Sequence, residues 1–214
     1  WLSPFIFAMY LNDLEDELFL KGAEGIDIGT LKIFLLMYAD DIVIFANSAE
    51  ELQKNLDILS TYCNRWKLTV NKDKTKVIIF RKGGRIPSNI SFYYDNSITE
   101  MVNRYSYLGI VFTSGGSFME AHKTLSGQAL KAIFKLRKYL YSYVNITVEH
   151  MLDLFEKLVK PILFYGAEVW GFAQANTIER VHTKFCKSVL GVKCSTQNDF
   201  IYGDLGRLRD FFVL

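Results

Sequence analysis

The sequence has little of what several classes of protein require. Its 214 residues include only three prolines and three cysteines, and half of the residues are hydrophobic. Intrinsic disorder needs few apolar residues and a high net charge, whereas the net charge here is +2. The three cysteines lack the spacing of a disulfide framework or a zinc ribbon, which favours a reduced, intracellular protein. The longest apolar runs, 33–38 and 42–46, are far shorter than the ~20 residues of a membrane-spanning helix, so we expect no membrane partner.

The first residues carry the signal of a helix start. Ser3 and Pro4 are residue types that cap and open a helix, and apolar residues follow at helical spacing as far as Leu20. The sequence therefore predicts a helix over 3–20. Because Trp1 leads into this helix without any preceding segment, we expect the chain to be a piece of a longer polypeptide.

Two short runs that are apolar at almost every position come next. Residues 31–37 and 42–46 are separated only by the four residues Tyr38–Asp41. Continuous apolar runs of this length, bounded by turn residues, are typical of buried strands. The sequence therefore predicts a buried β-hairpin with two carboxylates at its tip.

A helix and three strands are predicted after this hairpin. Ser48 and Glu51 have the spacing of a capping box, and apolar residues recur at helical spacing as far as Trp66. Strand signals follow at 76–80, 91–94 and 107–112.

Helices replace strands beyond Thr113. A loop rich in glycine and serine follows this residue, and apolar residues then recur at helical spacing over 125–140, 151–162 and 176–189. We place a domain boundary here, between 1–112 and 113–214. The predicted fold class is α+β: an antiparallel sheet with packed helices, followed by an all-helical region.

Basic residues are concentrated in two zones. Between residues 65 and 85 eight Lys or Arg accompany one acid, and between 121 and 194 eleven accompany five acids. A solvated lysine-rich surface is one interpretation, and a groove that neutralises a phosphate backbone is the other. Two of the predicted helices carry a basic stripe opposite their apolar face. The stripes consist of Lys131, Lys135 and Lys138, and of Arg180, Lys184 and Lys187.

Asp40 and Asp41 are the candidate metal ligands. Two adjacent carboxylates repel each other unless a cation or hydrogen bonds compensate them. A solvated turn, in which aspartate merely suits the backbone, is one interpretation. A magnesium site is the other, because hard cations take oxygen ligands and phosphoryl transfer uses carboxylates to hold them. The preceding Tyr38 and the apolar strands on both sides favour the metal site.

Six blocks along the chain resemble one family, in that family's order. They are Leu2–Phe5, Tyr38–Asp41, Leu68–Lys76, Tyr107–Ile110, Lys160–Gly171 and Phe185–Val192. Their order and gaps resemble those of the reverse transcriptases of non-LTR (LINE-like) retrotransposons. The resemblance extends over nearly the whole chain and implies a partial polymerase palm over 1–112, with a helical thumb and downstream region over 113–214.

The resemblance also implies roles at the metal site. Asp40 would be a ligand of Mg²⁺ or Mn²⁺, with Asp41 beside it in support. Either Lys74 or Lys76 would lie near the pyrophosphate leaving group. A lysine at a strand edge can also simply discourage aggregation, so the two interpretations of these lysines stay open.

Further roles concern the bound substrates. Ser3 and Pro4 would open the helix beside the incoming deoxynucleoside triphosphate. Tyr107, Leu108 and Gly109 would position the primer end, although tyrosine and leucine in a strand also suit a core. The two basic stripes would follow the backbones of the RNA template and the DNA primer.

One departure from the family pattern concerns the metal site. Polymerases of this family hold their metals with a further aspartate on an upstream strand, and their fingers also lie upstream; neither is in this sequence. We therefore expect little or no polymerase activity from this polypeptide alone, and we expect the N-terminal part of the same polypeptide to be its partner. The alternative is an inactive relic or a domesticated fragment that binds nucleic acid without catalysis. The family acts at chromosomal DNA, which implies a nuclear location when acting.

Overall fold

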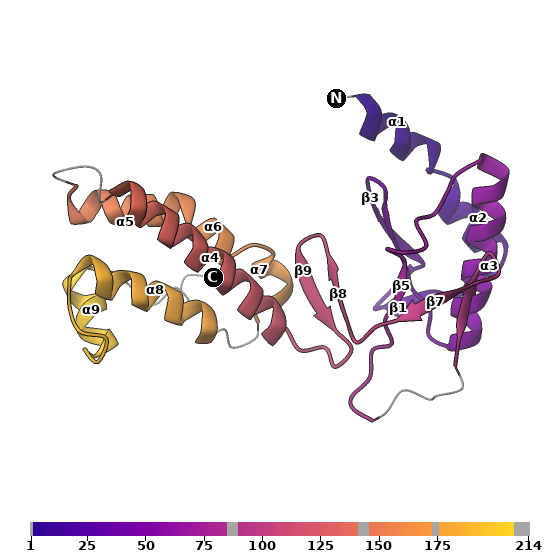
Figure 1. Cartoon of the computed structure of the whole chain (residues 1–214). Coiled ribbons are helices and arrows are strands. Elements are labelled where there is room, and N and C mark those ends of the chain that lie inside the picture. The colour runs from indigo at the N-terminus through magenta and orange to yellow at the C-terminus, as the bar shows by residue number, and fades with distance from the viewer. Residues whose placement is uncertain (1, 85–89, 141–145, 173–175, 208–214) are drawn as a thin grey trace. The chain divides into compact units, whose positions relative to one another are not determined.

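The computed structural model describes residues 2–84, 90–140, 146–172 and 176–207 (Figure 1). The packing of the chain divides it into two compact units. Unit 1 is formed by the residues up to Ile79 and by Gly83–Asn103, and unit 2 by Phe80–Lys82 and the residues from Arg104 onward. The α+β fold class is confirmed, with small, mostly antiparallel sheets beside helices.

Unit 1 contains helices and short strands that pair locally. In chain order they are α1 (Leu2–Tyr10), α2 (Leu14–Leu20), β1 (Ile26–Ile28), β2 (Leu31–Ile33), β3 (Leu35–Tyr38), β4 (Asp41–Ile44), α3 (Ala49–Trp66), β5 (Lys76–Val77), β6 (Phe92–Tyr94) and β7 (Ser97–Met101). β1 pairs with β2 and β3 with β4, while the third sheet has the order β5–β7–β6. The prediction of an antiparallel sheet needs one correction, because β5 and β7 run parallel.

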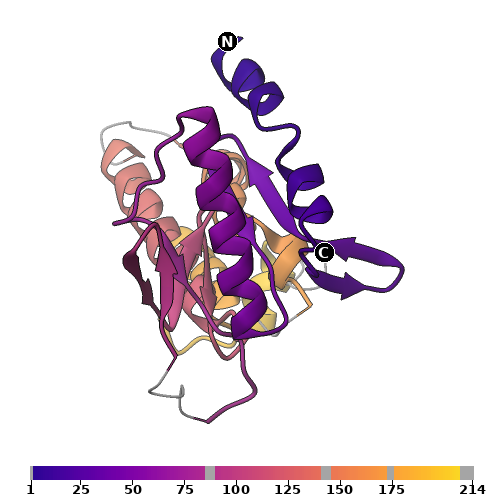
Figure 2. The same cartoon turned by 90° about the vertical axis from the view of Figure 1, so that its right-hand side faces the viewer.

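Helix α3 contributes five buried residues to the core of unit 1, more than any other described helix or strand of this unit. Ser48 caps it, and its hydroxyl accepts a hydrogen bond from the backbone N–H of Glu51 at 3.2 Å, as the capping box predicts. One face of the helix is buried, including Leu56, Leu59 and Tyr62. Figure 2 shows this long helix lying along the neighbouring strands, with the β1–β2 hairpin extending away from them.

The single helix predicted over 3–20 is wrong, because the chain turns between α1 and α2. Asn12 and Asp13 occupy this turn, and such residues favour turns over helix interiors. The hydroxyl of Tyr62 donates to the carboxylate of Asp13 and lies 3.3 Å from the carbonyl oxygen of Tyr10. A buried tyrosine of α3 therefore fixes the turn, and burial together with Asp13 raises the pKa of its hydroxyl.

Two of the predicted strands of unit 1 differ in extent. The strand predicted over 76–80 ends at Val77. Beyond it, Phe80–Lys82 pack with unit 2, where the N–H of Arg81 donates to the carbonyl of Ser114 at 2.8 Å. The strand predicted over 91–94 is present as β6, and it is followed by β7, which was not predicted.

Unit 2 begins with a hairpin and continues as helices. Its elements are β8 (Arg104–Tyr107), β9 (Ile110–Thr113), α4 (Met119–Leu140), α5 (Val148–Leu158), α6 (Lys160–Leu163), α7 (Ala167–Trp170), α8 (Asn176–Val189) and α9 (Asn198–Asp204). Their core includes Phe155, Leu163 and Trp170, each almost fully buried. The predicted break near Pro161 is confirmed, because α5 and α6 meet at Val159.

The hairpin β8–β9 stands where the sequence predicts a single strand, and it packs with unit 2. The single strand predicted over 107–112 is wrong, because Leu108 and Gly109 form a turn within it. β9 packs on α4, and its Ile110 belongs to the core of unit 2. The units therefore divide between Asn103 and Arg104, earlier than the expected boundary after residue 112. Among the described residues, none of the helices is long and apolar enough to cross a membrane.

Candidate active site

The hairpin β3–β4 presents the two candidate metal ligands at its tip. Tyr38 pairs with Asp41 in the antiparallel register, so Ala39 and Asp40 are the two turn residues. Ala39 has a φ of 53°, in the left-handed region that alanine rarely occupies. Asp40 lies in the turn and Asp41 is the first residue of β4, and both side chains are exposed.

The base of this hairpin is held by the core of unit 1. Leu35 is buried, and the ladder continues past the strands with a 2.9 Å hydrogen bond from the N–H of Phe45 to the carbonyl of Phe34. The side-chain amide of Asn55, 1% exposed in α3, donates to the carbonyl of Phe45 at 3.2 Å. The base is therefore fixed to α3.

The prediction that the whole hairpin is buried is wrong. Leu36, Met37 and Tyr38 are exposed by 47, 38 and 64% respectively. The described sheet has only two strands here, and the packed core reaches β3 at Leu35. The tip therefore stands out from the core of unit 1 and carries its carboxylates into solvent.

The negative charge at the tip of β3–β4 suits a bound cation. Among the described residues, the side chains of Asp40 and Asp41 have no hydrogen-bond or ion-pair partner. Adjacent carboxylates without a compensating group repel each other, and their oxygens are the donors that Mg²⁺ and Mn²⁺ prefer. The donor type therefore fits a divalent ion. The donor number is incomplete, because no group of three or more His, Cys, Asp or Glu that could hold a metal occurs among the described residues.

The predicted nucleotide-side residues lie in the first turn of α1. Ser3 and Pro4 are helical, as the sequence predicts. Farther along this helix Phe5, Ile6 and Met9 are exposed, each by more than half. The role of Ser3 and Pro4 beside a nucleotide stays a prediction.

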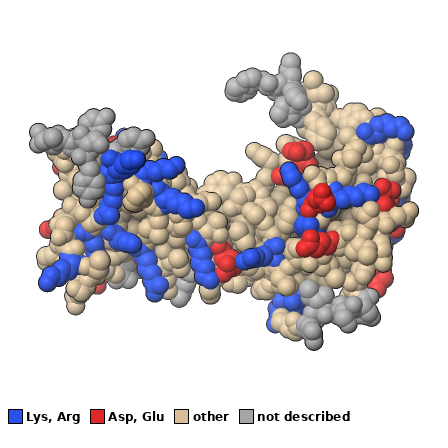
Figure 3. Space-filling model, viewed as in Figure 1, with Lys and Arg blue, Asp and Glu red and all other residues tan. Residues whose placement is uncertain are grey.

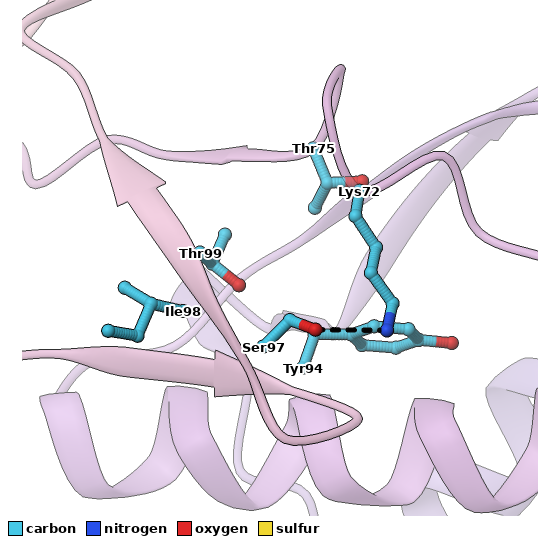
Figure 4. A pocket seen from close by; sticks show the side chains of 6 residues that line it. All are labelled: Lys72, Thr75, Tyr94, Ser97, Ile98 and Thr99. Atoms are coloured by element: carbon cyan, nitrogen blue, oxygen red, sulfur yellow. Dashed lines mark hydrogen bonds between the residues drawn. The ribbon is translucent and has the colours of Figure 1, made fainter.

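Lys72, in the loop that follows α3, binds the β6–β7 hairpin. The ammonium group of Lys72 donates to the carboxylate of Asp95 at 3.0 Å and to the hydroxyl of Ser97 at 3.1 Å. Figure 4 shows its side chain lying over Tyr94, with Ser97 at its end. Together with Thr75, Ile98 and Thr99 these residues line a small pocket. Lys72 therefore contributes to the fold of unit 1.

Lys74 and Lys76 have different surroundings. Lys76 pairs with Glu100 across the parallel strands β5 and β7, with its ammonium nitrogen 2.6 Å from the carboxylate. Lys74 is exposed, and its backbone N–H donates to Asn71. The ion pair of Lys76 links β5 with β7 in unit 1. The role of Lys74 at the leaving group stays a prediction. Lys72 and Lys76 form ion pairs with Asp95 and Glu100, respectively, and not with the carboxylates at the tip of β3–β4.

The predicted primer-grip residues form the turn of β8–β9 in unit 2. Leu108 and Gly109 have φ values of 46° and 81°, which is the two-residue pattern of a type I′ hairpin turn. The hydroxyl of Tyr165 donates to the carbonyl of Leu108 at 2.9 Å. A β-carbon on Gly109 would lie 3.0 Å from the ring of Tyr165. Tyr107 is half-buried in β8. The turn is thus held by a residue distant in sequence.

The two predicted basic stripes lie on α4 and α8, which pack together in unit 2. Lys131, Lys135 and Lys138 are exposed on α4, opposite the buried Leu125, Ala129 and Ile133. On α8, Arg180 and Lys184 are exposed, whereas the ammonium group of Lys187 donates to the carbonyl of Cys194 at 2.8 Å. Figure 3 shows Lys and Arg side chains spread over this face of unit 2, with few acids among them.

Sequence reasoning missed three residues that position the candidate site. Asn55 fixes the base of β3–β4, Glu100 pairs with Lys76, and Tyr165 holds the turn of β8–β9. The sequence offered one indication for Asn55: it is a polar residue directly beside apolar Leu56 on the core side of a predicted helix, which suggests a buried side chain with a hydrogen-bond partner. The partners of Glu100 and Tyr165 are 24 and 57 residues away in the sequence, and no local pattern reports such contacts.

Comparison with models of known protein families identifies one match. The family model described as "Reverse transcriptase (RNA-dependent DNA polymerase)" matches residues 1–112. This segment covers more than half of the chain and includes the β3–β4 hairpin with both aspartates. The chain belongs to the reverse transcriptase family.

The relatives of this reverse transcriptase chain come from non-LTR mobile elements. It is 22% identical to the RNA-directed DNA polymerase from mobile element jockey of Drosophila funebris over 200 residues, which are 89% of this chain and 21% of that protein. It is 28% identical to the transposon BS protein of Drosophila melanogaster over 186 residues, 84% of this chain and 20% of that protein. It is 27% identical to the Pol polyprotein of retrotransposable element R2 of Popillia japonica over 175 residues, 78% of this chain and 23% of that protein.

These findings define the family and its scope. The chain is a LINE-like reverse transcriptase sequence, and it spans about a fifth of the length of the relatives from jockey and BS. None of the comparisons favours the alternative of a non-catalytic relic. No solved structure matches it.

Proposed function

We propose that this chain is the part of a non-LTR reverse transcriptase that carries the metal-binding palm hairpin and the helices that hold nucleic acid. Its substrates are an RNA template, a DNA primer and deoxynucleoside triphosphates. One observation carries the proposal: Asp40 and Asp41 are exposed at the tip of a hairpin whose base is fixed to α3, and neither side chain has a partner among the described residues.

The residues at the tip would hold one or two divalent ions. Asp40 and Asp41 supply adjacent carboxylate oxygens, and the antiparallel register from Leu35↔Ile44 to Tyr38↔Asp41 limits their movement. Rigid placement matters because phosphoryl transfer depends on positioning and electrostatics more than on covalent chemistry of the protein. A bound divalent ion lowers the pKa of a hydroxyl nucleophile and stabilises the charge on the transferring phosphate.

Other residues would orient the substrates. Lys74 would compensate charge at the leaving pyrophosphate, Ser3 and Pro4 would open the helix beside the nucleotide, and the Leu108–Gly109 turn would position the primer end. The side chains of Lys131, Lys135, Lys138, Arg180 and Lys184 would contact sugar–phosphate backbones, with Lys187 tied to the Cys194 carbonyl beside them. Such contacts fix register without reading sequence.

The test is paramagnetic broadening of backbone amide signals by Mn²⁺ on the 214-residue chain. We expect selective broadening at residues 38–42 and its loss in an Asp40→Asn, Asp41→Asn double variant. The matched control is Glu15→Gln with Asp16→Asn, because these adjacent acids are also exposed but lie on a helix, where neighbouring side chains diverge. Equal broadening in the double variant, or stronger broadening at α2 than at the hairpin, would refute the metal assignment.

A further inference from the structure

An exposed aromatic ring stands among the cations of α4. Phe134 is 73% exposed, although α4 buries a separate apolar face formed by Leu125, Ala129, Ile133 and Leu136. Phe134 therefore contributes little to the core of unit 2. An exposed phenylalanine at this position leaves a large apolar surface in water, where it is available to a binding partner; the neighbouring charges decide which kind of partner it suits.

Cationic side chains flank this ring on both sides along the helix. Lys131 precedes Phe134 by three residues, and Arg137 and Lys138 follow it by three and four residues. Residues three and four apart on a helix have β-carbons about 5–6 Å apart, so these side chains are its neighbours on the surface. All three are exposed, and the sequence has no acid between Glu120 and Glu149.

This combination matches the chemistry of an unpaired nucleotide. Every base has an aromatic face that stacks on an aromatic side chain, and its flanking phosphates attract lysine and arginine. A regular duplex offers phosphates but keeps its base faces stacked on one another. The aromatic ring among cations therefore favours single-stranded nucleic acid over a duplex.

We propose that Phe134 is a stacking platform for an unpaired base of single-stranded nucleic acid, with Lys131, Arg137 and Lys138 contacting the adjoining phosphates. The inference rests on the proposed function for the kind of partner, but it requires no metal ion. It assigns base contact, and not only backbone contact, to the outer face of α4.

The chain contains a matched control for the aromatic ring. Phe200 on α9 is 65% exposed, but Asp199 precedes it and Asp204 follows it by four residues. The two phenylalanines thus share similar exposure on a helix of unit 2 and differ in the sign of the neighbouring charges. Phe200→Ala should leave binding of a single strand unchanged.

The test is the affinity of the 214-residue chain for a fluorescent single-stranded oligonucleotide of about 12 nucleotides, measured in EDTA over a series of salt concentrations. We expect Phe134→Ala to weaken binding about 5- to 30-fold, with the slope of log affinity against log salt unchanged. We expect Lys131→Gln with Lys138→Gln to reduce that slope by roughly 0.7 per lysine. An abasic oligonucleotide of the same length should bind wild type and Phe134→Ala equally.

Three outcomes would overturn the proposal. One is an unchanged affinity of Phe134→Ala. Another is an equal loss with the abasic oligonucleotide, because the ring would then act without a base. The third is a Phe134→Leu variant with wild-type affinity, because apolar contact without an aromatic face would be sufficient, as for a protein partner. The metal assignment is tested separately by Mn²⁺ broadening, so the two can fail independently.

Discussion

The hairpins β3–β4 and β8–β9 both turn on two residues, and their surroundings are opposite. In each turn the first residue is not glycine and has a positive φ: 53° at Ala39 and 46° at Leu108. The β8–β9 turn accepts a hydrogen bond from Tyr165, and Ile110 behind it is 5% exposed. The tip of the β3–β4 hairpin carries two exposed aspartates, one in the turn and one at the start of β4, without a side-chain partner among the described residues.

This difference separates two uses of a two-residue hairpin turn. Contacts within unit 2 determine the position of the β8–β9 turn, so changes around it should alter stability. Among the described residues, the contacts that fix the β3–β4 hairpin lie at its base. Under the proposed function, changes at its tip should therefore alter binding and catalysis while leaving stability nearly constant. The following expectations test this contrast in order of decreasing effect.

The largest effect is expected at the carboxylates. Under the proposed function, Asp40→Asn in a polymerase that includes this chain should reduce nucleotide incorporation about 100-fold or more, because a metal ligand carries several kcal/mol of transition-state stabilisation. The free energy of unfolding should change by less than about 0.5 kcal/mol. Primer extension and urea denaturation measure the two quantities, and Glu15→Gln serves as control. A large loss of stability in Asp40→Asn would contradict the contrast between the hairpins.

The next effect concerns the support of β8–β9. Gly166 has a φ of +68°, and a β-carbon there would lie 2.8 Å from the Cδ1 atom of buried Ile110. Gly166→Ala should therefore destabilise unit 2 by about 2–3 kcal/mol through backbone strain and crowding. Gly127→Ala in α4 is the control, since its β-carbon would meet nothing within 4 Å. This control should stabilise the chain by about 0.5–1 kcal/mol. Equal urea midpoints for both variants would refute the role of Gly166.

Acid should weaken the unit that holds β8–β9. His182 is 1% exposed and stacks on Phe155, and burial lowers its pKa to about 4. Because the unfolded chain binds a proton near pH 6.5 and the folded chain does not, stability should fall as the pH falls below 6.5, by about 2 kcal/mol between pH 7 and pH 5.

Amide hydrogen exchange localises this effect. Protection at Ile110 should decrease between pH 7 and pH 5, after correction for the intrinsic exchange rate, by more than protection at Val43. His182→Leu should remove most of the difference. An equal decrease in both hairpins would show that acid does not act through the core of unit 2.

A smaller effect is expected at the hydroxyl that holds the turn. Tyr165→Phe removes the 2.9 Å hydrogen bond to the carbonyl of Leu108, which should cost about 0.5–1 kcal/mol because the site is exposed to water. Tyr93→Phe is the matched control, since Tyr93 is also about half exposed and bonds to Gln53 through its backbone, with no hydrogen bond of its hydroxyl among the described residues. Thermal unfolding measures both. Indistinguishable variants would mean that the Tyr165 contact does not hold the turn.

The smallest effect is expected at the strained alanine. Ala39→Gly relieves the left-handed backbone but gives the unfolded chain more freedom, so the net stabilisation should be about 0.5 kcal/mol. Chemical denaturation measures it. Destabilisation by this substitution would mean that the Ala39 methyl group makes a contact that strengthens the tip.

Hydrophobic periodicity and capping residues correctly predicted the helices and strands whose buried positions are also their apolar positions. Ser48 and Glu51 mark the start of α3, and the apolar runs around Asp40 and Asp41 predict the hairpin. β7 was missed because its pattern is inverted: Ile98 is 72% exposed, while Thr99 is 6% exposed. The break between α1 and α2 was missed because apolar residues continue at helical spacing past Asn12 and Asp13, and the contact that fixes the turn comes from Tyr62, about 50 residues away along the chain.

The candidate site shows a similar division between local and distant information. The sequence predicts the two aspartates and their turn, because both follow from adjacent residues. It does not predict how far the tip stands out from the core, since exposure of Tyr38 depends on how many strands the sheet holds. Nor does it predict that Lys76 is paired with Glu100, because that pairing requires the parallel register of β5 and β7.

The boundary between the two units determines where truncations and chimaeric junctions in such chains should be placed. Similarity to the family model ends at residue 112, at the close of β9, whereas the packing divides before Arg104. A protein truncated where the similarity ends would keep the β8–β9 hairpin without the helices that bury Ile110, and would expose the apolar strand β9. An exchange of helical regions between related elements should therefore preserve function better with a junction near residue 103 than with one near residue 112.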